Sequence, residues 1–138
     1  MNATAWLKPL RHARGWLALW VLAVLAAIAV ELLPAMFLPR VPAGGDKLEH
    51  VLGYALLAFA AGQVFARRAW ARVGIGLVLL GLLLEIAQGT LTATRSADPG
   101  DALANGAGVL LGLGCAFTPL GDLLLRRAGT AAAGRDRG

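Results

Sequence analysis

Four long apolar segments, separated by short polar ones, constrain what this chain can fold into. They cover residues 15–33, 46–66, 73–91 and 99–117. Each holds about 19–21 residues, and at about 1.5 Å per helical residue that length crosses the roughly 30 Å hydrocarbon layer of a membrane. The mean hydropathy of +0.68 and the 15% share of charged residues are also unlike those of a soluble domain. The sequence therefore predicts an all-α, polytopic membrane protein in which four transmembrane helices form a small bundle.

The distribution of basic residues predicts the orientation of this bundle. Most of the 13 lysines and arginines lie before the first apolar segment, between the second and third, and after the fourth. The positive-inside rule therefore places both termini in the cytoplasm. The first segment is expected to be a retained span, because it is longer than the roughly 7–15-residue core of a signal peptide and lacks a small-x-small cleavage site. The charges sit at segment ends and form no binding face, so no nucleic-acid partner is expected.

One membrane domain is expected over residues 1–128, followed by a disordered tail over 129–138 that is rich in glycine, alanine and arginine. Asp46 is expected to cap the helix of the second segment, and Asp98, followed by Pro99, to cap that of the fourth. Small residues recur every four positions in the fourth segment, at Ala104, Gly108, Gly112 and Ala116. This spacing predicts a seam for close packing against a neighbouring helix.

Polar side chains interrupt the apolar segments at one expected depth. In this topology the second helix begins on the outer side, the third ends there and the fourth begins there. His50, Glu85 and Asn105 would then all lie about 6–9 Å inside their helix ends. An ionisable group that deep in lipid is costly unless it faces the bundle interior and is paired. We therefore expect an outward-facing polar pocket beneath the outer lipid headgroups.

The chemistry of the side chains predicts their roles in this pocket. Glu85 and His50 would form an acid–base pair if the site is catalytic. Substrate binding is expected of Lys47, Arg95, Tyr54, Gln88 and Asn105. Structural polar roles are expected of Asp46, Asp98 and Asp101, the last two as a helix cap and as a partner of the helix dipole. Tyr54 and Gln88 could equally serve as interhelical hydrogen-bonding groups.

These residues occur in an order and spacing that resembles the VanZ-like family of small bacterial membrane proteins. The matching positions are Asp46-Lys47-x-x-His50 with Tyr54, then Glu85-x-x-Gln88, then Arg95-x-x-Asp98-x-x-Asp101-x-x-x-Asn105-x-x-Gly108. The similarity covers residues 46–112, half of the chain. It implies a multi-pass protein of the bacterial inner (cytoplasmic) membrane. The family is named for a member associated with resistance to the glycopeptide teicoplanin, but a family name is not a mechanism, so a resistance role does not follow for this chain.

The leading hypothesis is a site that binds, and in an enzymatic version acts on, an anionic lipid or a lipid-linked cell-envelope precursor. Lys47, His50 and Arg95 would surround a phosphate at the N-terminus of the fourth helix, with the tail of the amphiphile in the bilayer. Whether the site catalyses a reaction stays open. The alternative is a non-enzymatic scaffold or partner-binding protein, in which the polar cluster only locks helix packing. A proton-coupled carrier is less favoured, because the inner halves of the spans show no polar path.

No cofactor is expected, and the single cysteine excludes a thiol metal cluster. A divalent metal, Mg²⁺ or Mn²⁺, is a less favoured variant. Its ligands would be Asp46, His50, Glu85 and either Asp98 or Asp101. Lys47 and Arg95 weigh against it, because neighbouring cations repel a metal ion. Membrane lipids are the expected partners, and the sequence does not indicate an oligomeric state.

Overall fold

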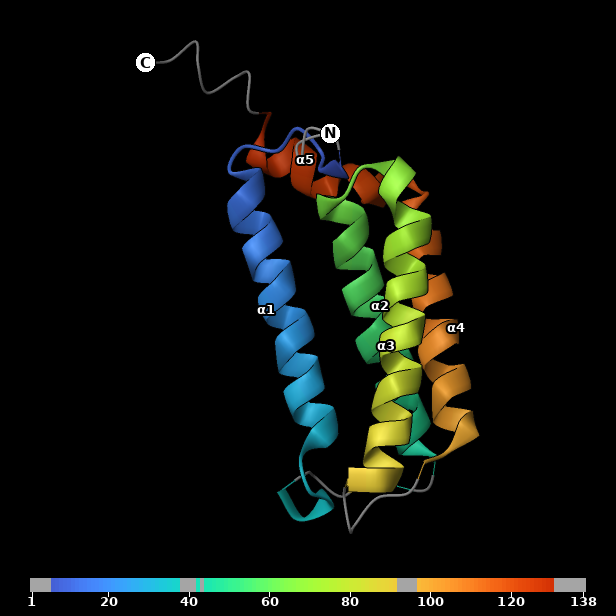
Figure 1. Cartoon of the computed structure of the whole chain (residues 1–138). Helices are drawn as coiled ribbons and strands as arrows, with labels where there is room; N and C mark the ends of the chain where they lie inside the picture. Colours follow the sequence, from blue (N-terminus) through green and yellow to red (C-terminus); the bar gives the residue numbers. More distant parts are fainter. Residues whose placement is uncertain (1–5, 38–41, 43, 92–96, 131–138) are drawn as a thin grey trace.

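The computed structural model describes residues 6–37, 42, 44–91 and 97–130, and the regular structure in these ranges is helical (Figure 1). The elements follow in the order α1 (Ala13–Leu32), η2 (Ala35–Phe37), α2 (Gly45–Val64), η3 (Arg67–Ala69), α3 (Trp70–Leu91), α4 (Pro99–Ala116), η4 (Pro119–Asp122) and α5 (Leu123–Ala128). Two isolated β-bridges join the N-terminal segment to the rest, Leu7 with Phe65 and Leu10 with Thr130. The predicted all-α class is confirmed.

The four long helices run alternately up and down the molecule, and α5 crosses their end beside the N-terminal segment (Figure 1). α2 and α4 pack most closely, and α3 packs against both. α1 lies at the edge and has no buried residue. The core consists of residues from α2, α3 and α4: Tyr54, Leu57, Ala58, Leu77 and Val109. Large apolar side chains cover much of the outer surface, which suits a protein surrounded by lipid.

Two helices among the described residues are long and apolar enough to cross a membrane, Ala13–Leu32 and Arg67–Leu91. The pair Pro99–Ala116 and Pro119–Ala128 makes a third if it is counted as one span, although it bends by 77°. α2 does not reach the same hydropathy, because polar residues fill its first two turns and Gln63 lies near its end. The structure thus supports a membrane protein with two or three candidate spans.

N-terminal caps explain where α4 and α2 begin. Asp98 is the N-cap of α4, where its Oδ1 accepts a hydrogen bond from the Gly100 amide at 2.7 Å, and Pro99 follows it as predicted. The prediction that Asp46 caps α2 is wrong. Gly44 is the N-cap there, with a φ of 80° that glycine adopts without strain. Asp46 instead lies in the first turn, where a carboxylate stabilises the positive end of the helix dipole.

The small-residue seam of α4 packs against α2, as its spacing predicts. A Cβ added at Gly108 would lie 3.0 Å from both the Ala55 amide nitrogen and the Tyr54 Cβ. The two backbones therefore approach too closely for any larger residue at this position. This contact fixes the rotation of α4 relative to α2, and with it the direction in which the polar residues of both helices point.

The opposite end of the bundle is closed by α5 and by the segment before α1. Gln63 of α2 donates to the Leu120 carbonyl oxygen at 3.0 Å and accepts from the Leu124 amide at 3.1 Å. Lys8 forms an ion pair with Asp122 at 2.8 Å. Gly129, placed by the sequence at the start of the tail, accepts a hydrogen bond from the Arg11 amide at 2.9 Å. The rest of the predicted tail, residues 131–138, lies outside the described residues.

Candidate functional site

Three helices bring polar side chains together at the end of the bundle opposite α5. α2 contributes Lys47 and His50 from its first turns, and α3 contributes Glu85 from near its end. α4 contributes its cap and two residues of its first turns: Asp98, Asp101 and Asn105. The helices alternate in direction, so the start of α2, the end of α3 and the start of α4 meet at one level. The depth register predicted from the sequence is therefore present in the structure.

His50 lies at the centre of this group and is held by Asn105. Its Nδ1 lies 2.9 Å from the Asn105 Oδ1, and the two side chains are almost completely buried. Because a carbonyl oxygen only accepts hydrogen bonds, the imidazole proton is on Nδ1. In the neutral ring Nε2 therefore carries a lone pair. That lone pair faces the carboxylates of Glu85 and Asp101.

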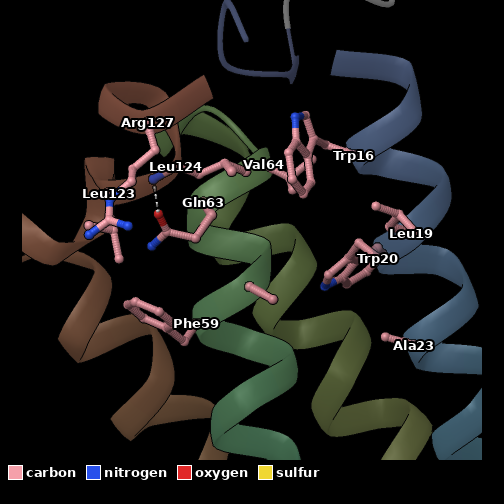
Figure 2. A pocket seen from close by; sticks show the side chains of 11 residues that line it. Trp16, Leu19, Trp20, Ala23, Phe59, Gln63, Val64, Leu123, Leu124 and Arg127 are labelled. Carbon is pink, nitrogen blue, oxygen red and sulfur yellow. Dashed lines mark hydrogen bonds between the residues drawn. The ribbon is translucent and has the colours of Figure 1, made fainter. Parts of the chain in front are cut away.

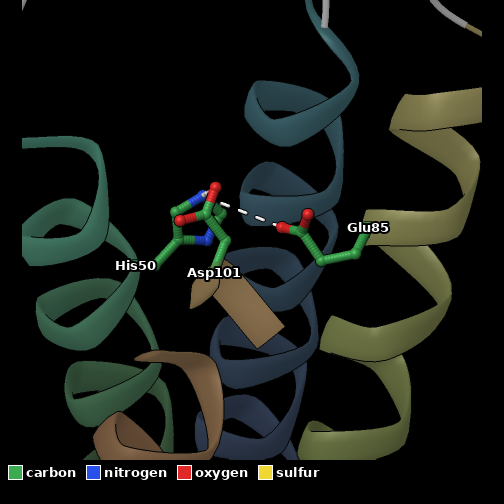
Figure 3. Close-up of side chains that lie close together, drawn as sticks. All are labelled: His50, Glu85 and Asp101. Carbon is green, nitrogen blue, oxygen red and sulfur yellow. Dashed lines mark ion pairs between the residues drawn. The ribbon is translucent and has the colours of Figure 1, made fainter. Parts of the chain in front are cut away.

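The two carboxylates face Nε2 at the distance of an ion pair and not of a hydrogen bond (Figure 3). The His50 Nε2 lies 3.9 Å from the Glu85 Oε1 and 3.8 Å from the Asp101 Oδ2. Both distances exceed the length of a hydrogen bond. The side chains of His50, Glu85 and Asp101 are 6%, 3% and 9% exposed. Three electron-rich atoms thus converge in a buried space.

The other oxygen of each carboxylate is anchored. Glu85 Oε2 accepts a hydrogen bond from the Asp98 backbone amide at 3.2 Å. Asp101 Oδ1 accepts from the Lys47 ammonium at 3.0 Å. Each carboxylate is therefore oriented by one oxygen and presents the second one to His50.

Lys47 and Asp98 form a rim above the buried group. The Lys47 Nζ lies 2.5 Å from the Asp98 Oδ2, and the two side chains are 44% and 43% exposed. Since Lys47 also binds Asp101, its ammonium is already paired with two carboxylates. Three carboxylates and one lysine leave this part of the described site net negative. Lys47 is therefore paired within the protein, in contrast to the phosphate contact predicted for it.

The remaining predicted site residues surround this centre. Tyr54 is 2% exposed and lies one turn below His50, in the apolar core. Gln88 donates to the Glu31 carbonyl oxygen of α1 at 2.7 Å, so it links α1 to α3. A carboxylate oxygen of Asp46 lies within 4.8 Å of oxygens of Asp98 and Asp101. Arg95 lies outside the described residues.

Sequence reasoning missed Gly81, which makes room for the site. A Cβ added there would lie 2.8 Å from the Asn105 Nδ2 and 3.1 Å from the Tyr54 hydroxyl. The signal in the sequence is that Gly81 lies one helical turn before Glu85, on the same face of α3. Glycines recur throughout this segment and favour close helix packing in general, so the sequence alone does not single out Gly81.

A cavity of about 520 Å³ lies at the opposite end, between α1, α2 and α5 (Figure 2). Its lining is apolar apart from Gln63 and Arg127. Gln63 is already bonded on both sides to the η4 and α5 backbone. Trp16 and Trp20 of α1 form one wall. This cavity offers space for an apolar chain but no convergent polar groups, so the polar centre is the candidate functional site.

Comparison with protein-family models, with curated proteins and with solved structures finds no match to this chain. The resemblance to the VanZ-like family therefore remains a prediction from the motif residues. Function has to be inferred from the chemistry of the site.

The ion pair at the rim predicts a pH dependence. The hydrogen bond from Lys47, followed by that from the Gly100 amide, lowers the pKa of Asp98. A lowered pKa in the folded state means that the unfolded chain binds the proton more tightly. Asp98 therefore contributes stability above its unfolded pKa of about 3.9, and this is lost as the pH falls through the lower folded value.

Asp98→Asn tests this dependence, because asparagine keeps the helix cap and removes the charge. We expect the apparent Tm of the purified protein in detergent to fall less steeply below pH 4 in Asp98→Asn than in the wild type. Glu49→Gln, at an exposed position of α2, is the control and should follow the wild type. Equal acid slopes for Asp98→Asn and the wild type would contradict the assignment.

Proposed function

We propose that this chain is a VanZ-like protein of the bacterial inner membrane whose polar centre faces the outer leaflet. There it binds the headgroup of an anionic lipid or of a lipid-linked cell-envelope precursor. In this proposal α1 to α4 are all transmembrane and both termini are cytoplasmic. The start of α2 is polar because it lies at headgroup level.

The distribution of charge supports this orientation. Basic residues gather at the end where α1 and α3 begin and α2 ends, among them Arg67, Arg68, Arg72 and Arg127. The polar centre is at the other end. By the positive-inside rule the basic end is cytoplasmic, so the centre faces outward.

The observation that carries the proposal is the convergence of three buried polar atoms beneath an exposed rim, one of which, the Glu85 Oε1, has no hydrogen-bond partner among the described residues. A polar cluster that serves only to lock helices pairs its groups with one another. Here the His50 Nε2, the Glu85 Oε1 and the Asp101 Oδ2 point at one another without a hydrogen bond. A buried carboxylate oxygen without a hydrogen bond is unusual in a native structure and indicates a binding or catalytic role. In an enzymatic version His50 and Glu85 would transfer protons, and the tail of the amphiphile would lie among the exposed apolar side chains.

One observation favours the scaffold as the second candidate. Polar contacts link all four long helices: His50 with Asn105 joins α2 to α4, Glu85 with the Asp98 amide joins α3 to the start of α4, and Gln88 with Glu31 joins α3 to α1. A cluster with only this role would need no unpaired carboxylate oxygen such as the Glu85 Oε1.

The variant His50→Asn separates the two candidates. The asparagine amide can replace Nδ1 in the bond to Asn105 but has no counterpart of Nε2. We expect native mass spectrometry of protein extracted with its own lipids to show at least a tenfold loss of bound anionic lipid. The apparent Tm should stay close to that of the wild type.

Glu49→Gln, on the exposed face of the same helix, should retain the lipid. A scaffold predicts unchanged lipid content in His50→Asn, with a Tm close to that of the wild type because the bond to Asn105 is kept. Wild-type protein that carries no enriched anionic lipid would refute the headgroup proposal. Teicoplanin sensitivity of cells expressing each variant tests whether this chain has a resistance role.

A further inference from the structure

We infer that the buried centre binds one first-row divalent metal ion through the His50 Nε2, the Glu85 Oε1 and the Asp101 Oδ2. The centre belongs to the site proposed above to receive an anionic headgroup. The inference rests on that proposed function only for the role of the ion, because the binding of the ion follows from the ligand geometry alone.

The distances between the three atoms are slightly longer than those between the ligands of a bound metal ion. One ligand atom of each side chain lies within 4.8 Å of the other two, and Nε2 is 3.8 Å from the Asp101 Oδ2 and 3.9 Å from the Glu85 Oε1. Ligands at about 2.0–2.2 Å from a tetrahedral ion are separated by about 3.3–3.6 Å. Small rotations of the two carboxylates would close this difference. The side chains come from α2, α3 and α4 and point toward one another in Figure 3.

The unpaired oxygen of Glu85 is the observation that requires a ligand. Glu85 is 3% exposed, and its Oε1 has no hydrogen-bond partner in the described part of the chain. A buried carboxylate oxygen without a partner is costly. The His50 Nε2 lies 3.9 Å from this oxygen, and its lone pair repels the oxygen unless a proton or a metal ion lies between them.

Each of the three ligand side chains is also oriented by a hydrogen bond to its other polar atom. Asn105 fixes the proton of His50 on Nδ1, and leaves Nε2 as the donor atom. The Asp98 amide holds Oε2 of Glu85, and Lys47 holds Oδ1 of Asp101. Metal-binding histidines and carboxylates generally have such outer partners, which set the ring tautomer and the direction of the free oxygen.

Lys47 does not exclude the ion. Its ammonium lies on the far side of the Asp101 carboxylate, bonded to Oδ1 and to Asp98, whereas Oδ2 faces His50. The neighbouring carboxylate group of Asp46, Asp98 and Asp101 is a weaker candidate, because Lys47 already binds two of its members.

The ligand set indicates the class of metal. One imidazole nitrogen with two carboxylate oxygens suits Zn²⁺ or Mn²⁺ better than Ca²⁺ or Mg²⁺, which prefer oxygen ligands alone. Three protein ligands leave a further coordination position open. An anionic headgroup could fill it from the exposed rim, and the ion would compensate the negative charge of the three carboxylates.

Purified protein in detergent, stripped with a chelator and then loaded with Zn²⁺ or Mn²⁺, tests the inference. After desalting, elemental analysis should find one ion per chain, and the ion should raise the apparent Tm. Glu85→Gln and Asp101→Asn, which keep the shape of each side chain, should each lower the metal affinity at least tenfold. Glu49→Gln, an exposed carboxylate one residue from His50, should bind as the wild type does.

Two results would overturn the inference: folded wild-type protein that binds no ion, or equal affinity in the wild type and in both ligand variants. If one of the two ligand variants does not fold, the other still tests the site, because the loss of either ligand should lower the metal affinity. The same samples, analysed for anionic lipid with and without chelator, keep the two proposals apart. If the protein binds metal but no anionic lipid, only the proposed function is refuted. If it binds anionic lipid but no metal, only this inference is refuted.

Discussion

Replacing Gly112 with leucine is expected to separate α2 from α4 and to abolish the folded bundle. A Cβ at this position would lie 2.8 Å from the Phe59 amide nitrogen and 2.9 Å from the Ala58 Cβ, and it would also overlap the Ala55 carbonyl oxygen. Overpacking a core that can adjust its side chains costs about 1–3 kcal/mol. Here the obstacle is the α2 backbone, so the whole helix has to move, and we expect a cost above that range.

Thermal unfolding and size-exclusion chromatography in detergent measure this effect. Gly114→Leu is the matched control, because nothing lies within 4 Å of a Cβ there. It makes the same change of helix propensity in the same helix. A Gly112→Leu protein that unfolds at the temperature of the control would show that α2 and α4 are not in contact along this seam.

The helices and the polar level were predictable because their signals are local or follow from chain direction. The fourth apolar segment, predicted over residues 99–117, is α4 over Pro99–Ala116, since Asp98 and Pro99 mark its start. The matching depths of His50 and Glu85 follow from alternating helix direction and a fixed rise per residue. Neither feature depends on side-chain conformations.

The pairing within the site was less predictable, because it depends on how α2 is rotated against α4. Lys47 was expected to face a ligand, but the close contact at Gly108 brings it onto Asp98 and Asp101 instead. The six-residue helix α5 also escaped prediction. It is too short for a periodic signal, and its place is set by Gln63 from a distant part of the chain.

Replacing Asn105 with leucine is expected to disable the metal site while leaving all three ligands in the chain. Asn105 is 1% exposed, and its Oδ1 is the partner of the His50 Nδ1 among the described residues. Leucine has a similar volume but no acceptor. Leaving the buried Nδ1 unpaired costs about 1–3 kcal/mol. The imidazole can then exchange tautomers, so that Nε2 often carries the proton and does not bind the metal.

Loss of such an outer partner typically lowers metal affinity about 10–100-fold, and we expect this range for Asn105→Leu. Asn105→Asp restores the acceptor oxygen and should recover most of the affinity, which a purely structural role of Asn105 does not predict. Leu103→Ala, at an exposed position of the same helix, serves as the control. Competitive titration of Zn²⁺ against a chromophoric chelator measures all four proteins. If Asn105→Leu binds Zn²⁺ as tightly as the wild type, His50 is not oriented by this bond, and the tautomer assigned to it is wrong.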